Sequence, residues 1–356
     1  MTQPELPVID GPNCPLPIHN RGTIVLGHGS GGQMTHDLIR DVFHSRLSNA
    51  ILNASNDAAK IPETPSGKRL VVSTDAHIVT PLFFAGGDIG RLAVCGTVND
   101  VATLGAEPHY LTATFILEEG FAIHELELIV DSFADACHEA GVELIAADTK
   151  VTEKGKSDKL FISTTGFGWA ESRLQIGGEQ AKPGDAVIIS GPVGNHGIAV
   201  AEARGNLGFS SQVCSDIAPL NHMVKALLDA NLDVHVLRDP TRGGLATTLV
   251  EIARQSKVNI QLDEENIPVD KPVRKTCELL GLDPLYLANE GKLILILPAE
   301  QAEQALQVMH NSRYGGKAKL IGKVLEQSKG QVWLKTPFGT TRVLEMLAGE
   351  MLPRIC

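Results

Sequence analysis

Short apolar runs and longer amphipathic segments alternate along most of this chain, and each kind has its own period. The short runs are typical of buried strands. In the first half they occupy 70–73, 110–117, 142–146 and 160–164. Two longer segments, 88–104 and 123–140, repeat their apolar residues at helical spacing. Strands that alternate with helices predict an α/β (α+β) fold in which helices pack on a mixed sheet.

The second half of the chain continues the same alternation. Strands are expected at 186–189, 234–237 and 293–297, and helices at 217–230, 245–254 and 301–309. The last two apolar runs, 320–325 and 331–334, predict a closing hairpin. A single core rarely serves more than roughly 250 residues, so a chain of 356 residues is expected to form two domains.

A glycine-rich loop at His28–Gly32 precedes the first helical pattern. The backbone N–H groups of such a loop can bind phosphate. The loop is not a Walker A motif, because Gln33 stands where that motif requires Lys. It does satisfy G-x-G-x-x-G, but a single match is weak evidence, and the acidic residue expected for a dinucleotide site, Asp57, comes slightly late. A dinucleotide-binding domain therefore remains a rival interpretation.

Carboxylates recur where apolar segments end or are interrupted. Asp75 and Asp148 each follow a predicted strand, which predicts a row of carboxylates along one edge of a sheet. Asp100 lies inside a helix that is apolar nearly all round, and no Lys or Arg lies one turn away. A buried carboxylate needs a partner, which is either an internal hydrogen bond to the backbone or a metal shared with Asp57 and Asp75.

Composition and charge exclude several classes of protein. A net charge of −11, 4% aromatic residues and the lack of a basic cluster argue against a nucleic-acid-binding protein. The N-terminus has no signal-peptide pattern, and no apolar stretch is long enough for a membrane span. The six Cys are scattered, so neither a zinc site nor a disulfide framework is predicted. We therefore expect a reduced, cytoplasmic protein.

The sequence ends on Pro353-Arg354-Ile355-Cys356, which carries a thiol beside a terminal carboxylate. Pro353 stops a preceding helix or strand, so these residues are predicted to form a short arm. Taken alone, a frayed terminus is the simpler interpretation. A nucleotide-binding body upstream would favour a functional thiol instead.

Seven short motifs, taken together, resemble those of the HypE-type hydrogenase maturation proteins. They are His28–Gly32, Ser73–His77, Gly96–Asp100, Ala147–Lys150, Arg238–Gly244, Ala288–Lys292 and Pro353–Cys356. Each motif is weak alone, but they occur in the family's order along nearly the whole chain. The family lies in a superfamily that includes aminoimidazole ribonucleotide synthetase (PurM), selenophosphate synthetase and thiamine-monophosphate kinase.

The resemblance implies a two-domain PurM-like fold, in which each domain is a mixed sheet with helices packed on it. It also implies a homodimer that pairs through the N-terminal domains, with ATP near the domain and dimer junction. The implied divisions are an N-terminal extension at 1–21, a first domain at 22–170, a second domain at 171–342 and a flexible C-terminal tail at 343–356.

The same resemblance implies an activity. A carbamoyltransferase, HypF, places a carbamoyl group on Cys356, and the chain then uses ATP and Mg²⁺ to dehydrate this thiocarboxamide to a thiocyanate. The cyano group passes to the iron held by the HypC–HypD complex. Because oxide is a very poor leaving group, the amide oxygen must first be phosphorylated, and this step depends on the positioning of Mg-ATP and on charge compensation.

The resemblance also implies roles for individual residues. The implied metal ligands are Asp57, Asp75, Asp100 and Asp239. The implied ATP contacts are His28, Gly29, Ser30, Gly31, Gly32, Asp148 and Arg242. The implied catalytic residues are Cys356, Lys150 and Glu290, supported by Pro353, Arg354 and Ile355 of the tail. His77 is a second-rank candidate.

Three alternatives remain. A small-molecule kinase of the same superfamily has no use for a C-terminal Cys. A non-catalytic nucleotide-binding partner does not account for four separated Asp together with Lys150 and Glu290. A dinucleotide-dependent dehydrogenase explains only the first glycine-rich loop.

Overall fold

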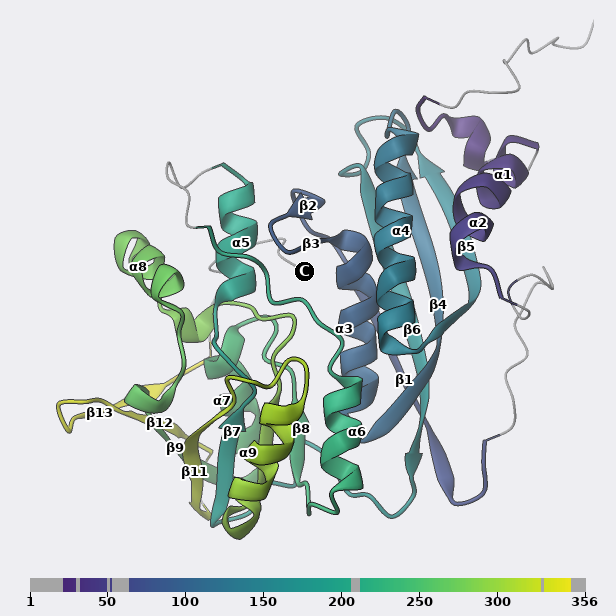
Figure 1. The fold of residues 1–356 in the computed structure, drawn as a ribbon. Helices are drawn as coiled ribbons and strands as arrows, with labels where there is room; N and C mark the ends of the chain where they lie inside the picture. The colour runs from purple at the N-terminus through teal and green to yellow at the C-terminus, as the bar shows by residue number, and fades with distance from the viewer. Residues whose placement is uncertain are drawn as a thin grey trace, which may run out of the picture.

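The structure is a computed structural model, and it describes residues 22–29, 33–49, 52, 64–205, 212–327 and 330–346. In these residues two β-sheets with their helices form two halves that lie side by side (Figure 1). Helix α3 (Ile89–Thr103) lies at the junction, where it packs on the first sheet and contacts α6 (Asn221–Asp229) and β8 (Val236–Arg238) of the second half. None of the helices in the described part of the chain has the length and apolar character needed to span a membrane.

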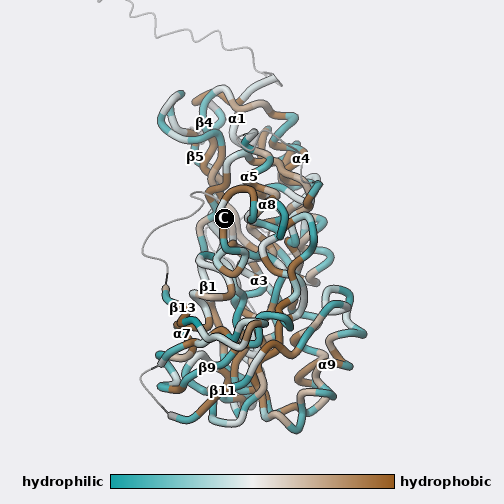
Figure 2. Tube along the Cα trace, turned by 90° about the vertical axis from the view of Figure 1, so that its left-hand side faces the viewer, coloured by the Kyte–Doolittle hydropathy of each residue, from teal (hydrophilic) through white to brown (hydrophobic). Residues whose placement is uncertain are grey.

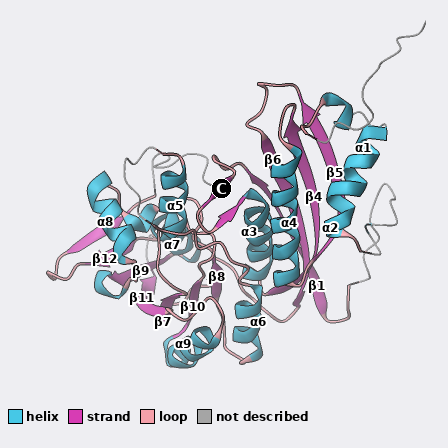
Figure 3. Cartoon of the chain, turned by 45° about the horizontal axis from the view of Figure 1, so that its top comes forward, coloured by secondary structure: helices cyan, strands magenta, loops and turns pink. Residues whose placement is uncertain are grey.

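The first sheet has four strands in the order β1-β6-β4-β5. Their bounds are β1 Lys68–His77, β4 Ala106–Glu118, β5 Glu143–Thr152 and β6 Leu160–Glu171. β6 is antiparallel to β1 and β4, whereas β5 runs parallel to β4. A parallel pair needs a crossover, and α4 (Ile123–Ala140) provides it while lying beside α3 on one face of the sheet (Figure 3).

The helices of the first half form where the apolar spacing predicts them. The buried side chains of α4 include Leu126, Val130, Phe133 and Cys137, which are the residues of its predicted apolar face. Helix α3 is buried nearly all round because it lies between the first sheet and the second half. The side chain of Asp88 caps its N-terminus and accepts hydrogen bonds from two backbone N–H groups of the first turn.

Short helical turns precede the first sheet. They are η1 Leu26–Gly29, α1 Gln33–Leu38, the π-helix η2 Ile39–His44 and α2 Ser45–Leu47. The apolar run at 23–26, which by its composition would suit a strand, does not form one: only Thr23 makes a β-bridge, to Ala122, and the 3₁₀ turn begins at Leu26. Ala122 is followed at once by α4, so it offers no longer strand with which the segment could pair.

The second sheet has seven strands in the order β13-β12-β9-β11-β7-β10-β8. The bounds not yet given are β7 Asp185–Ile189, β9 Val258–Asp263, β10 Ile294–Pro298, β11 Lys319–Gln327, β12 Val332–Lys335 and β13 Thr341–Leu344. The helices of this half besides α6 are α5 Asn195–Ala203, α7 Gly244–Ser256, α8 Lys271–Leu280 and α9 Ala302–Asn311. The small elements are the β2–β3 pair, Phe83–Phe84 with Gly87–Asp88, and the 3₁₀ turns Glu264–Asn266, Pro284–Tyr286 and Ala299–Gln301.

Two predictions for the second half are wrong. β11 and β12 do not form a hairpin, because β9 lies between them and β12 pairs with β13 instead. The helix expected at 217–230 begins only at Asn221, and residues 217–220 before it have no regular secondary structure. Pro219 accounts for this delay, since a proline disfavours helical backbone in the residue before it.

The two sheets are covered differently. Alternate residues of β7 and β10 enter two separate apolar clusters, one against α7 and the other against α6 and α9, so both faces of the second sheet are buried. This explains the continuous apolar runs of these strands, and apolar positions recur along the chain through both halves (Figure 2). In the first sheet the face opposite α3 and α4 keeps Leu70 and Val72 44% and 50% exposed.

Candidate functional site

A cavity at the junction of the two halves collects most of the predicted acidic residues. It is lined by Asp75, Ala76 and His77 of β1, Gly96 and Asp100 of α3, Asp239, Thr241 and Arg242 of the loop after β8, and Glu290. Three of the four predicted metal ligands therefore meet Glu290 and Arg242 in one place. Both halves of the chain contribute, so the cavity exists only where the halves are in contact.

Asp100 explains how a carboxylate is accommodated in an apolar helix. Its Oδ2 accepts a hydrogen bond from the Ser73 hydroxyl at 2.8 Å, across the contact between α3 and β1. Burial raises the pKa of Asp100, and the charge of Asp75 adds to the increase. The internal partner of Asp100 is thus the Ser73 hydroxyl, and Asp100 also lines the cavity.

The loop that carries Asp239 and Arg242 is held by close backbone packing. Gly244 begins α7 with φ +62°, and a Cβ there would lie 2.5 Å from the carbonyl oxygen of Leu287. Only glycine permits this approach, and it brings the loop against the segment that leads to Glu290. Asn289 reinforces the contact, because its Nδ2 donates to the carbonyl of Pro240 at 2.9 Å.

The carboxyl groups of the cavity raise one another's pKa values. Burial, followed by the charge of Asp100, raises the pKa of Asp239 to about 7. Burial, followed by the charge of Asp239, raises the pKa of Glu290 well above its usual value. Glu290 is 4% exposed, and its Oε1 has no hydrogen-bond partner among the described residues. A cation placed between these groups would therefore be favourable.

The donor set suits Mg²⁺, which prefers carboxylate oxygens. Within the described ranges no three acidic, His or Cys side chains are close enough to form a complete metal site by themselves. Mg²⁺ usually keeps several waters and binds through one or two carboxylates together with substrate phosphates. The cavity fits that mode of binding, with ligands divided between protein and nucleotide.

His77 lines the same cavity in a neutral form. It is 2% exposed, and burial lowers the pKa of its imidazole despite the nearby Asp75. Its Nε2 lies 3.3 Å from the Thr164 hydroxyl and 3.8 Å from Asp75 Oδ2. The neutral ring can orient a neighbouring group without adding charge to the site.

Lys150 and Asp148 do not line the cavity. They form an ion pair of 2.8 Å on β5 with side chains 63% and 60% exposed. Asp148 is in register with Thr114, Ser163 and Ala76, and this row lies on the face of the sheet opposite to Asp75. Asp148 is one register position from the row of Asp75, so the two lie at the same end of the sheet as predicted, but on opposite faces because side chains alternate along β5.

The first glycine-rich loop is described only in part. His28 is buried and closes a turn with Val25, whose N–H donates to His28 Nδ1 at 3.0 Å, and burial lowers the pKa of this imidazole. Gly29 ends the same 3₁₀ turn. Other predicted site residues lie outside the described residues: Ser30, Gly31, Gly32, Asp57, Pro353, Arg354, Ile355 and Cys356.

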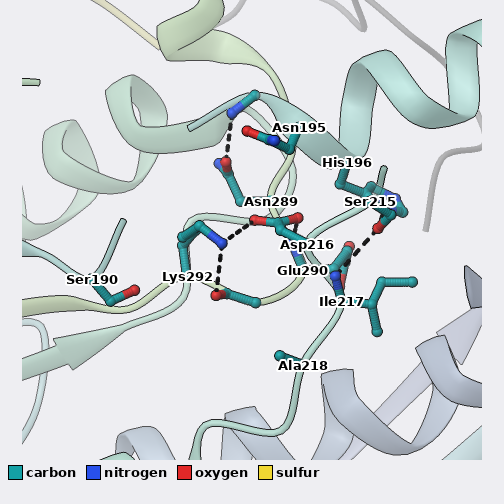
Figure 4. A network of polar contacts seen from close by, with 12 residues as sticks. Ser190, Asn195, His196, Ser215, Asp216, Ile217, Ala218, Asn289, Glu290 and Lys292 are labelled. Carbon is teal, nitrogen blue, oxygen red and sulfur yellow. Dashed lines mark hydrogen bonds and ion pairs between the residues drawn. The ribbon is translucent and has the colours of Figure 1, made fainter. Parts of the chain in front are cut away.

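Sequence reasoning missed Asp216, which contacts the backbone beside Glu290. Its Oδ1 accepts a hydrogen bond from the Glu290 N–H at 3.1 Å, and its Oδ2 lies 3.0 Å from Lys292 Nζ (Figure 4). The residue was hidden in a segment expected to form a surface loop and a helix. Pro219 was the available signal that the helix begins after this segment.

Known proteins match the chain along nearly its whole length. The sequence models described as AIR synthase related protein, N-terminal domain, and AIR synthase related protein, C-terminal domain, match residues 55–170 and 182–335. Carbamoyl dehydratase HypE of Azotobacter vinelandii is 51% identical over 335 residues, which cover 94% of this chain and 98% of that protein.

Solved structures agree with these matches. Hydrogenase maturation protein HypE in complex with ATP superimposes with a TM-score of 0.89 at 50% identity, covering 94% of this chain and all of the other. A HypE–HypF complex gives a TM-score of 0.75 at 46% identity and covers 87% and 99% of the two chains. The predicted resemblance and two-domain PurM-like fold are thereby confirmed. The chain belongs to the HypE family of hydrogenase maturation proteins, among the AIR synthase related proteins.

Proposed function

We propose that this protein is an ATP-dependent carbamoyl dehydratase that converts a thiocarboxamide on Cys356 into a thiocyanate, and so supplies cyanide ligands for the iron of [NiFe]-hydrogenase. The observation that carries the proposal is the cavity in which Asp75, Asp100 and Asp239 meet Glu290. The name of the 51% identical relative supports the reaction, and a solved relative that binds ATP supports the co-substrate.

The reaction consumes one ATP for each water removed. The carbamoyl oxygen bonds to the γ-phosphorus as the bond from that phosphorus to the ADP oxygen breaks. The carbon–oxygen bond then breaks with its electron pair, and phosphate departs with the original carbamoyl oxygen. The nitrogen gives up both protons to bases, and a carbon–nitrogen triple bond remains on the sulfur.

Asp75, Asp100 and Asp239 would hold Mg²⁺ together with the phosphates of ATP. The ion would compensate the phosphate charge and the charge of the crowded carboxylates. Arg242 lines the same cavity and can donate to a phosphate oxygen in a bidentate manner. Asp57 is the fourth proposed ligand, and the loop of His28, Gly29, Ser30, Gly31 and Gly32 is proposed to cover the phosphates.

Glu290 is proposed to accept a proton from the carbamoyl nitrogen. A raised pKa makes an ionised carboxylate a stronger base, and burial raises the pKa of Glu290. Positive charge at the neighbouring aspartates would favour the ionised form, which can accept the proton. The unpartnered Oε1 leaves one oxygen available for the substrate. The thiocarboxamide would reach this oxygen on the arm formed by Pro353, Arg354, Ile355 and Cys356.

The position of Lys150 and Asp148 fits a homodimer. Both lie on the open face of the first sheet, which also exposes Leu70 and Val72. Pairing of two such faces would remove this apolar surface from water and place Lys150 and Asp148 at the contact. ATP near the dimer junction would then be within reach of both residues, and Lys150 would join Glu290 in proton transfer.

HypF is the proposed source of the carbamoyl group, and the HypC–HypD complex is the proposed acceptor of the cyano group. A solved HypE–HypF complex of a 46% identical relative supports the first partnership. The experiment that tests the function is intact-mass spectrometry with HypF, carbamoyl phosphate and Mg-ATP. The wild-type chain should gain one carbamoyl group and then lose one water, whereas Cys356→Ala should gain neither.

Two results would contradict the proposed function. Modification of Cys356→Ala would show that another residue accepts the carbamoyl group. Rapid ATP turnover by a chain that has not been carbamoylated would favour a small-molecule kinase. Cys214 is exposed, so Cys214→Ala serves as the matched control and should behave as the wild type does.

A further inference from the structure

The segment that carries Glu290 is held by residues that do not line the cavity. Glu290 lines the cavity, and its Oε1 atom makes no hydrogen bond within the described residues. The direction of this side chain is therefore not fixed by its own polar contacts. It depends on the backbone of residues 289–292 and on what holds that backbone (Figure 4).

One buried ion pair holds three successive residues. Asp216 Oδ1 accepts from the Glu290 N–H at 3.1 Å. Lys292 Nζ lies 3.0 Å from Asp216 Oδ2 and donates to the carbonyl of Gly291 at 3.1 Å. The side chains of Asp216 and Lys292 are only 6% and 11% exposed. The contact with Oδ2 is an ion pair rather than a well-aligned hydrogen bond.

The contact between the two backbones leaves no free space. A Cβ on Gly291 would lie 1.8 Å from the carbonyl oxygen of Asp216, so only glycine fits. The Ala218 N–H donates to the carbonyl of Glu290 at 3.3 Å. Asn99 of α3 donates to the carbonyl of Ala218 at 3.0 Å. The segment 216–220 thus links Glu290 to the helix that supplies Asp100.

From this geometry we propose that Asp216 and Lys292 are positioning residues, which fix the backbone of residues 290–292 so that the Glu290 carboxyl points into the cavity. The inference rests on the role proposed for Glu290 above. A buried ion pair contributes little net stability compared with an apolar pair of similar volume. Its value here is geometric, because a charge pair with two further hydrogen bonds defines one arrangement of the backbone.

The test is a single-turnover measurement on the full chain, carbamoylated by HypF and then mixed with Mg-ATP. Asp216→Asn should slow the loss of water on the order of 10²-fold, which is the effect of a displacement of about 1 Å at a reacting group. Carbamoylation of Cys356 and the affinity for ATP, measured by calorimetry, should stay unchanged. Lys292→Met should show the same loss, and Lys292→Arg, which keeps the charge, should recover most of the rate.

Asp185→Asn is the matched control. Asp185 is also buried, and its Oδ2 lies within hydrogen-bond distance, 2.8 Å, of His235 Nδ1 in the same half of the molecule. This variant should unfold at a lower temperature but dehydrate at the wild-type rate per folded chain. An equal loss of rate in Asp185→Asn would reduce the role of Asp216 to general stability and overturn the proposal.

The variant Glu290→Gln distinguishes the positioning role of Asp216 from the proton-accepting role proposed for Glu290. In that background Asp216→Asn should add no further loss, because Asp216 acts through Glu290. If Glu290→Gln is slow but Asp216→Asn dehydrates normally, positioning is wrong and the role of Glu290 stands. If Glu290→Gln itself dehydrates at the wild-type rate, the role of Glu290 fails, and the positioning role fails with it. Additive losses would also overturn positioning.

Discussion

The two sheets of this molecule differ in how many of their faces are buried. The second sheet is covered on both faces, and its strands read as continuous apolar runs. The first sheet is covered by α3 and α4 on one face, while the other keeps Leu70, Val72, Asp148 and Lys150 accessible. The second sheet therefore acts as a closed scaffold, and the first has a surface that is free to pair.

The same contrast holds for two aspartates of the first sheet. Asp75 faces α3 and lines the cavity, whereas Asp148 faces outward and pairs with Lys150. Both follow apolar residues of a strand, so composition does not distinguish them. The face on which a carboxylate lies decides whether its neighbours are other carboxylates or solvent, and so decides its chemistry.

The largest expected effect is loss of metal-dependent turnover on the inner face. Asp75→Asn should lower Mg-dependent ATP turnover by the carbamoylated chain on the order of 10²–10³-fold, because a fixed charge at the phosphates is removed. Turnover is measured by phosphate release, and folding by circular dichroism. The surface change Asp229→Asn, which breaks an exposed ion pair with Lys225, should have no effect. Normal turnover by Asp75→Asn would contradict the proposed metal site.

The next effect concerns the open face of the first sheet. Wild-type protein at micromolar concentration should sediment with about twice the chain mass of 38.0 kDa. Val72→Asp places a charge in the proposed contact and should shift the protein to a monomer. Leu279→Asp on α8 is the control, because Leu279 is 72% exposed and lies in the other half. A wild-type monomer would show that the open face has another use.

A smaller effect follows from the raised pKa of Asp239. The folded chain keeps the Asp239 proton up to about pH 7, whereas an ordinary aspartate loses it near 3.8. Between these values the folded state binds more protons, so this group lowers stability as pH rises from about 4 to about 7. The melting temperature of the wild type minus that of Asp239→Asn should fall as pH rises through this window. Addition of Mg²⁺ at pH 7.5 should restore the difference.

The rise of the Asp239 pKa from 3.8 to about 7 corresponds to about 4 kcal/mol across the window. Since about 1 kcal/mol shifts the melting temperature of a domain of this size by roughly 2–4 °C, the difference should reach on the order of 10 °C. Asp131→Asn is a suitable control, because Asp131 is exposed and pairs with Arg46 on the surface. If the melting temperature of the wild type relative to Asp239→Asn rises between about pH 4 and about pH 7, the raised pKa of Asp239 is contradicted.

The smallest expected effect is at the start of α3, the helix that both halves share. Asp88→Ala removes the side chain that accepts two backbone hydrogen bonds, and should cost about 1 kcal/mol in the free energy of unfolding measured with urea. Asp88→Asn keeps the acceptor oxygen and should cost less. Equal stability of Asp88→Ala and wild type would show that the cap contributes nothing.

Much of the fold follows from local periodicity. The spacing of Leu126, Val130 and Phe133 predicted α4, and the unbroken apolar runs predicted the central strands of the second sheet. The pairing of β12 with β9 and β13 could not be predicted, because it depends on contacts between distant segments. A hairpin between β11 and β12, which are neighbours in sequence, was the simplest expectation, but β9 lies between them in the sheet.

The site was predicted through motifs rather than through periodicity. Asp75, Asp100, Asp239 and Glu290 were named from separate motifs, and the fold brings all four together. The shared edge of Asp75 and Asp148 was predictable, but the face of Asp148 was not, because the predicted strand ended before this residue and one residue changes the face of a strand. Asp216 was missed because its neighbours in space, Glu290 and Lys292, are more than seventy residues away in sequence.

The cavity has a consequence for how the molecule holds together. Its carboxylates come from both sides of the junction, Asp75 and Asp100 from one half and Asp239 and Glu290 from the other. Ionisation of all four would place like charges on both sides of that junction, and the raised pKa values of Asp239 and Glu290 reduce this repulsion. A divalent ion bound with its nucleotide would compensate the same groups and strengthen the contact between the halves. Under the proposed function, binding of the nucleotide and contact between the halves would be coupled, and release of ADP and phosphate would weaken that contact.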